Sequence, residues 1–138
     1  MLKCNWLEKQ FRFTGLVRPD EIPALIGIMD LVVHLSRREG LPRALPQALA
    51  AGKPVVAYDC DGAKEVCLND QTGFLLAPGD LTGLTNRVLQ LAESPALREK
   101  FGARGRQIVG EEFDVDRMID RLHQLYLKLA RNRGIPTS

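Results

Sequence analysis

The chain has 138 residues, of which 45% are hydrophobic, and its 19 basic and 17 acidic residues leave a net charge of +2. This size and composition suit a single domain with one buried core, and so small and dispersed a charge argues against a nucleic-acid-binding protein. Three cysteines without a CxxC pair indicate neither a disulfide framework nor a zinc site, and no apolar run approaches the roughly 18 residues of a membrane span.

The first third of the chain alternates segments of strand and helix character. Residues 11–15 predict a short strand closed by glycine, and residues 20–29 predict a helix with one apolar face. Residues 31–35 are almost wholly apolar, which is typical of a strand buried on both faces of a parallel sheet. We therefore expect His34, within this strand, to be packed in the core and not catalytic.

A short helix and a strong strand follow in the middle of the chain. Residues 43–51 predict a helix that Gly52 ends, and Pro46 is tolerated because it lies in the first turn. Pro54 then precedes an apolar strand at Val55–Tyr58. Strands that alternate with helices in this way predict an α/β fold with a mostly parallel sheet.

The rest of the chain is mainly helical. Residues 63–68 predict a short helix, and Gly73–Leu76 predicts a strand at the outer edge of the sheet. Three apolar stripes at helical spacing come next, and we expect the first two to face the core. The third and strongest stripe could also dock on a partner outside this chain; it contains Val115, Met118, Ile119, Leu122, Leu125, Tyr126 and Leu129. Residues 131–138 predict a flexible polar tail within the single domain 1–138.

Residues 36–57 carry most of the functional information. Glu39 and Gly40 stand just ahead of the predicted helix at 43–51. Such an arrangement brings a negative side chain and several free backbone N–H groups to one place. It suits a ligand that has both hydroxyl and phosphate groups.

Several short motifs occur in a characteristic order over nearly the whole chain. They lie at residues 13–17, 29–36, 39–40, 48–57, 61–62, 65–66 and 73–76, and at Asp80 and Phe113. Together they resemble the C-terminal, donor-binding domain of the family 4 (group 1) retaining glycosyltransferases of GT-B fold, which contain two Rossmann-like domains. The resemblance implies a Rossmann-like three-layer domain with flanking helices, truncated at its N-terminal side.

The resemblance also implies roles for individual residues. Glu39 matches the catalytic-site glutamate that meets the hydroxyls of the donor sugar, and Gly40 and Leu41 would offer backbone N–H groups beside it. The second glutamate of the family motif, which binds the ribose, is replaced here by Gln47. An amide keeps one acceptor oxygen but loses the charge, so we expect altered ribose binding with weaker hydrogen bonds.

The remaining donor contacts implied by the resemblance involve the base and the diphosphate. Gly15, Leu16 and Val17 would lie against the nucleobase, largely through their backbone. The diphosphate would approach the N-terminus of the 43–51 helix, where Arg43 adds positive charge; a solvated position for Arg43 is the equal alternative. No metal and no further cofactor are expected.

The implied reaction is transfer of a sugar from a nucleoside-diphosphate sugar to an acceptor hydroxyl, with retention. Only residues 1–10 precede the first predicted strand, so we expect a fragment that lacks its acceptor-binding N-terminal domain and is inactive alone. The three cysteines suggest reduced thiols and therefore a cytoplasmic protein. Its uncovered surface favours self-association. Two alternatives stay open: a non-catalytic nucleotide-sugar-binding module, and a relative of nucleotide-sugar epimerases or phosphorylases.

Overall fold

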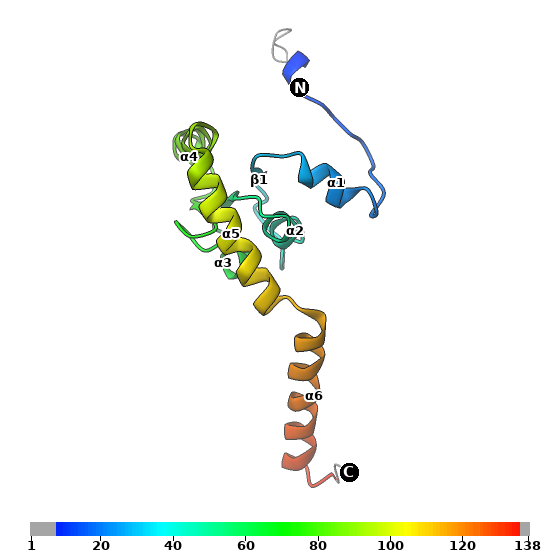
Figure 1. Cartoon of the computed structure of the whole chain (residues 1–138). Helices are drawn as coiled ribbons and strands as arrows, with labels where there is room; N and C mark the ends of the chain where they lie inside the picture. Colours follow the sequence, from blue (N-terminus) through cyan, green and yellow to red (C-terminus); the bar gives the residue numbers. More distant parts are fainter. Residues whose placement is uncertain (1–7, 136–138) are drawn as a thin grey trace.

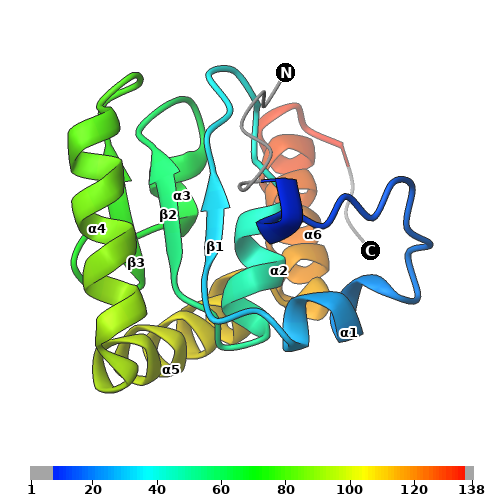
Figure 2. The same ribbon diagram turned by 90° about the horizontal axis from the view of Figure 1, so that it is seen from above.

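Three short parallel strands form the centre of the computed structural model, which describes residues 8–135. They are β1 (Val32–His34), β2 (Val55–Tyr58) and β3 (Gly73–Leu76), and they lie in the order β1-β2-β3. Figure 2 shows the strands running side by side in one direction. Val32 pairs with Val55, and Val56 pairs with Phe74. The predicted α/β class and the parallel sheet are confirmed.

Helices cover both faces of this sheet (Figures 1 and 2). They are α1 (Ile22–Gly27), α2 (Ala44–Ala50), α3 (Ala63–Val66), α4 (Leu81–Glu93), α5 (Pro95–Glu112) and α6 (Val115–Asn132), after a 3-10 turn at Glu8–Gln10. The three long helices each begin at a side chain that accepts a hydrogen bond from a first-turn N–H. Asp80 accepts from Gly83, Ser94 from Leu97 and Asp114 from Arg117. Such caps fix where α4, α5 and α6 start.

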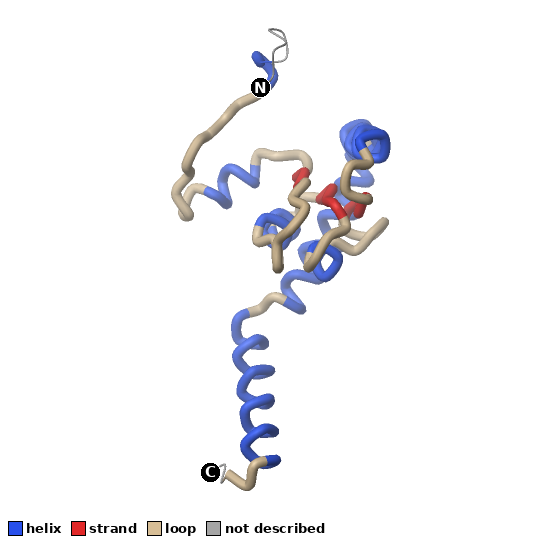
Figure 3. Tube along the Cα trace, turned by 180° about the vertical axis from the view of Figure 1, so that it is seen from behind, coloured by secondary structure: helices blue, strands red, loops and turns tan. Residues whose placement is uncertain are grey.

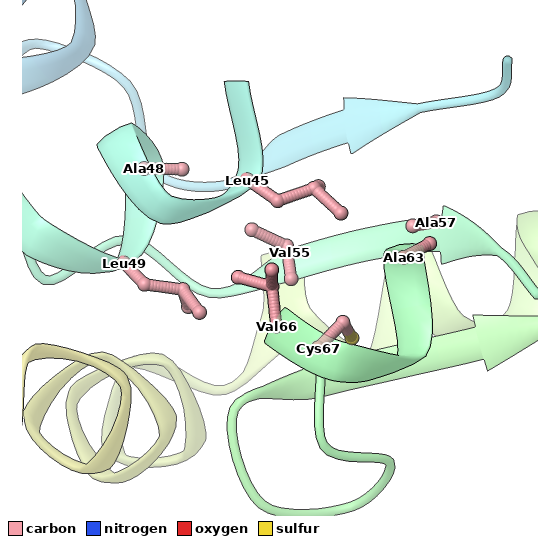
Figure 4. Close-up of a cluster of buried hydrophobic side chains, with 8 residues drawn as sticks. All are labelled: Leu45, Ala48, Leu49, Val55, Ala57, Ala63, Val66 and Cys67. Atoms are coloured by element: carbon pink, nitrogen blue, oxygen red, sulfur yellow. The ribbon is translucent and has the colours of Figure 1, made fainter. Parts of the chain in front are cut away.

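The alternation of side chains along β2 divides the core into two clusters. One lies between the sheet and the helices α2 and α3 (Figure 4), and it contains Leu45, Ala48, Leu49, Val55, Ala57, Ala63, Val66 and Cys67. The other lies toward α4 and the start of α5, and it contains Val56, Tyr58, Phe74, Leu76, Leu91 and Phe101. Because β2 is buried on both faces, the domain has the three layers expected of a Rossmann-like fold.

The predicted strand at residues 11–15 is wrong, since the structure gives this segment no strand. Phe13 is 86% exposed, and its ring stacks on that of Phe11, at a centroid distance of 6.2 Å. A strand needs a neighbour to satisfy its backbone groups. Within residues 8–135 the sheet consists of β1, β2 and β3, and none of them pairs with this segment.

Burial of the 31–35 strand on both faces is also wrong in part. Val33 of β1 is 42% exposed. Val33 lies on the face of the sheet that α4 covers. However, α4 packs on β2 and β3, so it leaves Val33 uncovered. His34 is more enclosed, with a side chain that is 21% exposed, but it belongs to neither core cluster and borders an open cavity, so the expectation that it is packed in the core is met only in part. The position of β3 at an edge of the sheet is confirmed.

The last helix stands apart from the sheet. Figures 1 and 3 show α6 extending from the end of α5, away from the strands. No residue of α6 is buried, and the seven residues of its predicted apolar stripe are 44% to 63% exposed. The helix continues to Asn132, two residues into the predicted tail, and residues 136–138 lie outside the described part of the chain.

Candidate functional site

Two loops that follow adjacent strands hold one another in place at the C-terminal end of the sheet. Gly62 donates its N–H to the Gly40 carbonyl oxygen at 2.9 Å, and Glu39 donates its N–H to Asp61 Oδ2 at 2.9 Å. The Cys60 thiol lies 2.8 Å from the Ser36 carbonyl oxygen. Because the loop after β1 is bonded to the turn after β2, the backbone of Glu39 has a defined position.

The side chain of Glu39 lies beside that of His34. Glu39 Oε2 is 3.0 Å from His34 Nε2, and the Glu39 side chain is 44% exposed. Both residues border an open cavity of about 390 Å³, which is lined by His34, Glu39, Gly40, Leu41, Arg43 and Ala44. A carboxylate in this position is free to accept hydrogen bonds from a ligand in the cavity.

One carboxylate and one guanidinium line the cavity, those of Glu39 and Arg43, and further carboxylates lie near Cys60 in the neighbouring turn. The pKa of the Cys60 thiol is raised, first by desolvation and then by the charges of Asp61, Asp59 and Glu39. Arg43 is the one cationic residue in the described lining of the cavity. An anionic group would therefore be held on the Arg43 side, at the start of α2, and a neutral hydroxyl group beside Glu39.

The structure brings together some of the predicted site residues and separates others. Glu39, Gly40, Leu41 and Arg43 share one cavity. Leu16 and Val17 line a different hollow against α1, and Gln47 lines a third one between α1 and α2. Gly15 adopts a φ of +65°, which suits glycine at the bend of this exposed segment. The proposed base and ribose contacts thus lie outside the Glu39 cavity.

Sequence reasoning missed the contact between His34 and Glu39. His34 was assigned to the core because the strand around it is apolar. The available sign was its place in the last position of a parallel strand, since ligands of open α/β sheets bind beyond the carboxyl ends of the strands. Asp61 belongs to the motif at residues 61–62, and the structure shows that it accepts a hydrogen bond from the Glu39 backbone.

Within residues 8–135 no group of three or more histidine, cysteine, aspartate and glutamate side chains is arranged to hold a metal ion. Among the helices that the structure describes, none is both long and apolar enough to cross a membrane. Cys60 and Cys67 are free thiols, and Cys4 lies outside the described residues.

Comparison with known proteins gives consistent matches. A family model described as glycosyl transferases group 1 matches residues 4–108. N-acetyl-alpha-D-glucosaminyl L-malate synthase of Bacillus anthracis is 29% identical over 132 residues, which make up 96% of this chain and 34% of that protein. The chain spans about a third of the length of the first curated relatives that it matches.

Solved structures are similar over most of the chain. HepE of Anabaena in complex with UDP has a TM-score of 0.83 and 31% identity, over 89% of this chain and 34% of that one. The same protein has been solved with UDP-glucose. The C-terminal domain of a group 1 family glycosyltransferase, LpcC of Francisella tularensis, has a TM-score of 0.73 and 26% identity, over 80% of this chain and 57% of that one.

Proposed function

The chain belongs to the glycosyl transferases group 1 family, and on this basis we propose that it forms the donor-binding part of a retaining glycosyltransferase. The parent enzyme would transfer a sugar from a nucleoside-diphosphate sugar to an acceptor hydroxyl. The observation that carries the proposal is the position of Glu39, whose carboxylate borders an open cavity just beyond the C-terminal end of β1. Ligands of open α/β sheets bind at such a place.

The lining of the cavity suits the two chemical parts of such a donor. The Glu39 carboxylate accepts hydrogen bonds from sugar hydroxyls, and the backbone of Gly40 and Leu41 lies beside it. Arg43 and the start of α2 would meet the diphosphate, because a cation and free N–H groups attract an anion. The N–H groups of Leu45 and Gln47 are already bonded to Pro42 and Arg43, so Arg43 carries more of this attraction than the helix does.

The nucleoside contacts extend the proposal. Gln47 would accept a ribose hydroxyl through its amide oxygen, and residues 15–17 would cover the base. These groups lie in separate hollows. For them to meet one nucleotide, the 11–18 segment must approach α2, as it would if residues 11–15 were held in a sheet. HepE has been solved with UDP and with UDP-glucose, so these two compounds are the first probes to test.

The remainder of the parent protein would supply the acceptor-binding domain. The chain spans about a third of its relatives, and we propose that it binds the donor without turning it over, with no metal or other cofactor. The apolar face of α6 and the uncovered edge of β1 would pack against the other part of the longer protein. In the isolated chain, self-association would hide the same surfaces.

A titration of the chain with UDP and UDP-glucose, extended to other nucleoside-diphosphate sugars, tests this function. We expect Glu39→Gln to weaken UDP-glucose binding about 10-fold or more, as loss of charge-assisted hydrogen bonds does, and to leave UDP binding unchanged. Glu99→Gln, at an exposed position on α5, serves as the matched control. The proposal is refuted if no nucleotide sugar binds, and turnover by the chain alone would refute its predicted inactivity.

Gln47 favours a second candidate, a nucleotide-sugar-binding module without catalysis. Glutamine in place of the family's glutamate removes a charged acceptor from the ribose position. Donor binding without turnover in the full-length parent would support this second function. Turnover restored by Gln47→Glu would instead identify an enzyme whose donor site has been weakened.

A further inference from the structure

We propose that His34 is a positioning residue for Glu39, and that it determines which lone pairs of the carboxylate are open to the donor sugar. The inference rests on the proposed donor-binding function and deepens it. His34 lies in the last position of β1, and its Nε2 atom is 3.0 Å from Glu39 Oε2. Neither the family match nor the similar structures assign a role to this contact.

Glu39 needs an anchor because its own segment is irregular. It lies in the loop between β1 and α2, and its backbone is held through the bond to Asp61. In the described residues, His34 is the one side chain that bonds to its carboxylate. Without that bond, the long glutamate side chain would sample several rotamers, and ligand binding would have to order it at a cost in affinity.

His34 is well placed to act as the anchor. Its strand is paired, with His34 in register with Ala57, the third residue of the buried strand β2. The His34 side chain is 21% exposed, against 44% for Glu39. The backbone of His34 is thus fixed by the sheet, and its side chain borders the cavity beside Glu39.

This geometry defines the sugar chemistry that the site would accept. When His34 donates from Nε2, it occupies one lone pair of Oε2 and leaves Oε1 and the outer lone pair of Oε2 free. Both oxygen atoms of the carboxylate thus keep an acceptor position, which matches two hydroxyl groups on adjacent carbon atoms. We therefore infer a donor sugar with vicinal free hydroxyls at the position that faces Glu39.

The test compares UDP with UDP-glucose as probes in titrations of the whole chain. We expect His34→Leu to weaken UDP-glucose binding about 10-fold, the range of one hydrogen bond to a charged group, and to leave UDP binding unchanged. His34→Gln retains an N–H donor on a flexible chain, so we expect it to recover part of the loss. Unchanged UDP-glucose affinity in His34→Leu would overturn the proposal, as would equal losses for both probes or no recovery in His34→Gln.

A measurement without ligand tests the contact itself. The chain has two histidines, and the second, His123, is exposed on α6 and provides an internal reference. We expect Glu39→Ala to move the imidazole nitrogen resonances of His34 and to leave those of His123 in place. Unmoved His34 resonances would overturn the anchor, whereas wild-type chain that binds neither probe would overturn the proposed function and the role of His34 with it.

Discussion

Replacement of Gly62 by alanine tests whether the two site loops depend on their close approach. Gly62 is buried at the start of α3, with φ −81° and ψ 1°, a conformation that alanine adopts without strain. A Cβ atom there would clash with the Gly40 carbonyl oxygen. It would also lie 3.1 Å from the Gly40 carbonyl carbon and 3.3 Å from Leu41 Cα, which is closer than ordinary van der Waals contact. All three atoms belong to backbone, so they cannot turn away as a side chain would.

The magnitude follows from three contributions. A shift of Gly40 weakens the bond from Gly62 N–H to its carbonyl oxygen, which costs about 0.5 to 1.5 kcal/mol. The added methyl overpacks the contact, which costs about 1 to 3 kcal/mol. Lower entropy of the unfolded chain offsets about 0.4 to 1 kcal/mol. We expect a net destabilisation of about 0.5 to 4 kcal/mol, together with weaker UDP-glucose binding because Glu39 adjoins Gly40.

Urea denaturation followed by far-UV circular dichroism measures the change, at one fixed protein concentration because self-association would add to the apparent stability. Gly110→Ala is the matched control, since Gly110 lies in α5 and a Cβ atom there meets nothing within 4 Å. Alanine in that exposed helical position should stabilise by about 0.5 to 1 kcal/mol. If Gly62→Ala unfolds at the same or a higher urea concentration than the wild type, the reasoning about the two loops is refuted.

Two further predictions concern α6 and the buried thiol. The double variant Leu122→Lys and Leu125→Lys, at the centre of the exposed α6 stripe, should lower the apparent mass in light scattering toward that of a monomer. The control Asp120→Lys on the same helix should leave the apparent mass unchanged. A wild-type chain that is monomeric at high concentration would count against self-association. Burial raises the pKa of the Cys67 thiol from 9.0 to about 12, so the folded state keeps a proton that the unfolded state releases. The free energy of unfolding should therefore fall as pH rises from about 9 to about 12, and this group contributes at most about 1.4 kcal/mol per pH unit. In Cys67→Ala the free energy of unfolding should fall less steeply with pH. Equal pH slopes in the variant and the wild type would contradict the assignment to Cys67.

The strands that the sequence predicts correctly are those whose surroundings are complete. Val55–Tyr58 and Gly73–Leu76 form strands with the predicted bounds. β2 is covered on both faces and paired on both edges, so its uniform apolar pattern matches its environment. Residues 11–15 have an equally strand-like composition, but pairing is a property of the neighbour as well as of the segment, and their exposure shows that the neighbour is absent from the described residues.

In the candidate site, too, the features that are local in sequence could be predicted and the long-range contacts could not. The Glu39-Gly40 motif is contiguous in sequence, and the structure places both residues at one cavity. The bond from Glu39 N–H to Asp61 joins residues 22 positions apart, and it depends on β1 and β2 lying side by side. Parallel neighbours bring their C-terminal loops to the same edge, so the sheet order, once known, makes this contact understandable. Sequence periodicity alone does not specify it.

The unpaired 11–15 segment and the uncovered edge of β1 are explained by one strand order. A doubly wound sheet has the order 3-2-1-4-5-6, and ligands bind where that order reverses, between strands 1 and 4. We infer that the order β1-β2-β3 corresponds to strands 4-5-6, so that Glu39 lies in the loop after strand 4, at the point of reversal. Residues 11–15 precede β1 in the chain and would then correspond to strand 3, which pairs with strand 2 and not with strand 4. Completion of the site and pairing of this segment would therefore require the same two strands, 1 and 2.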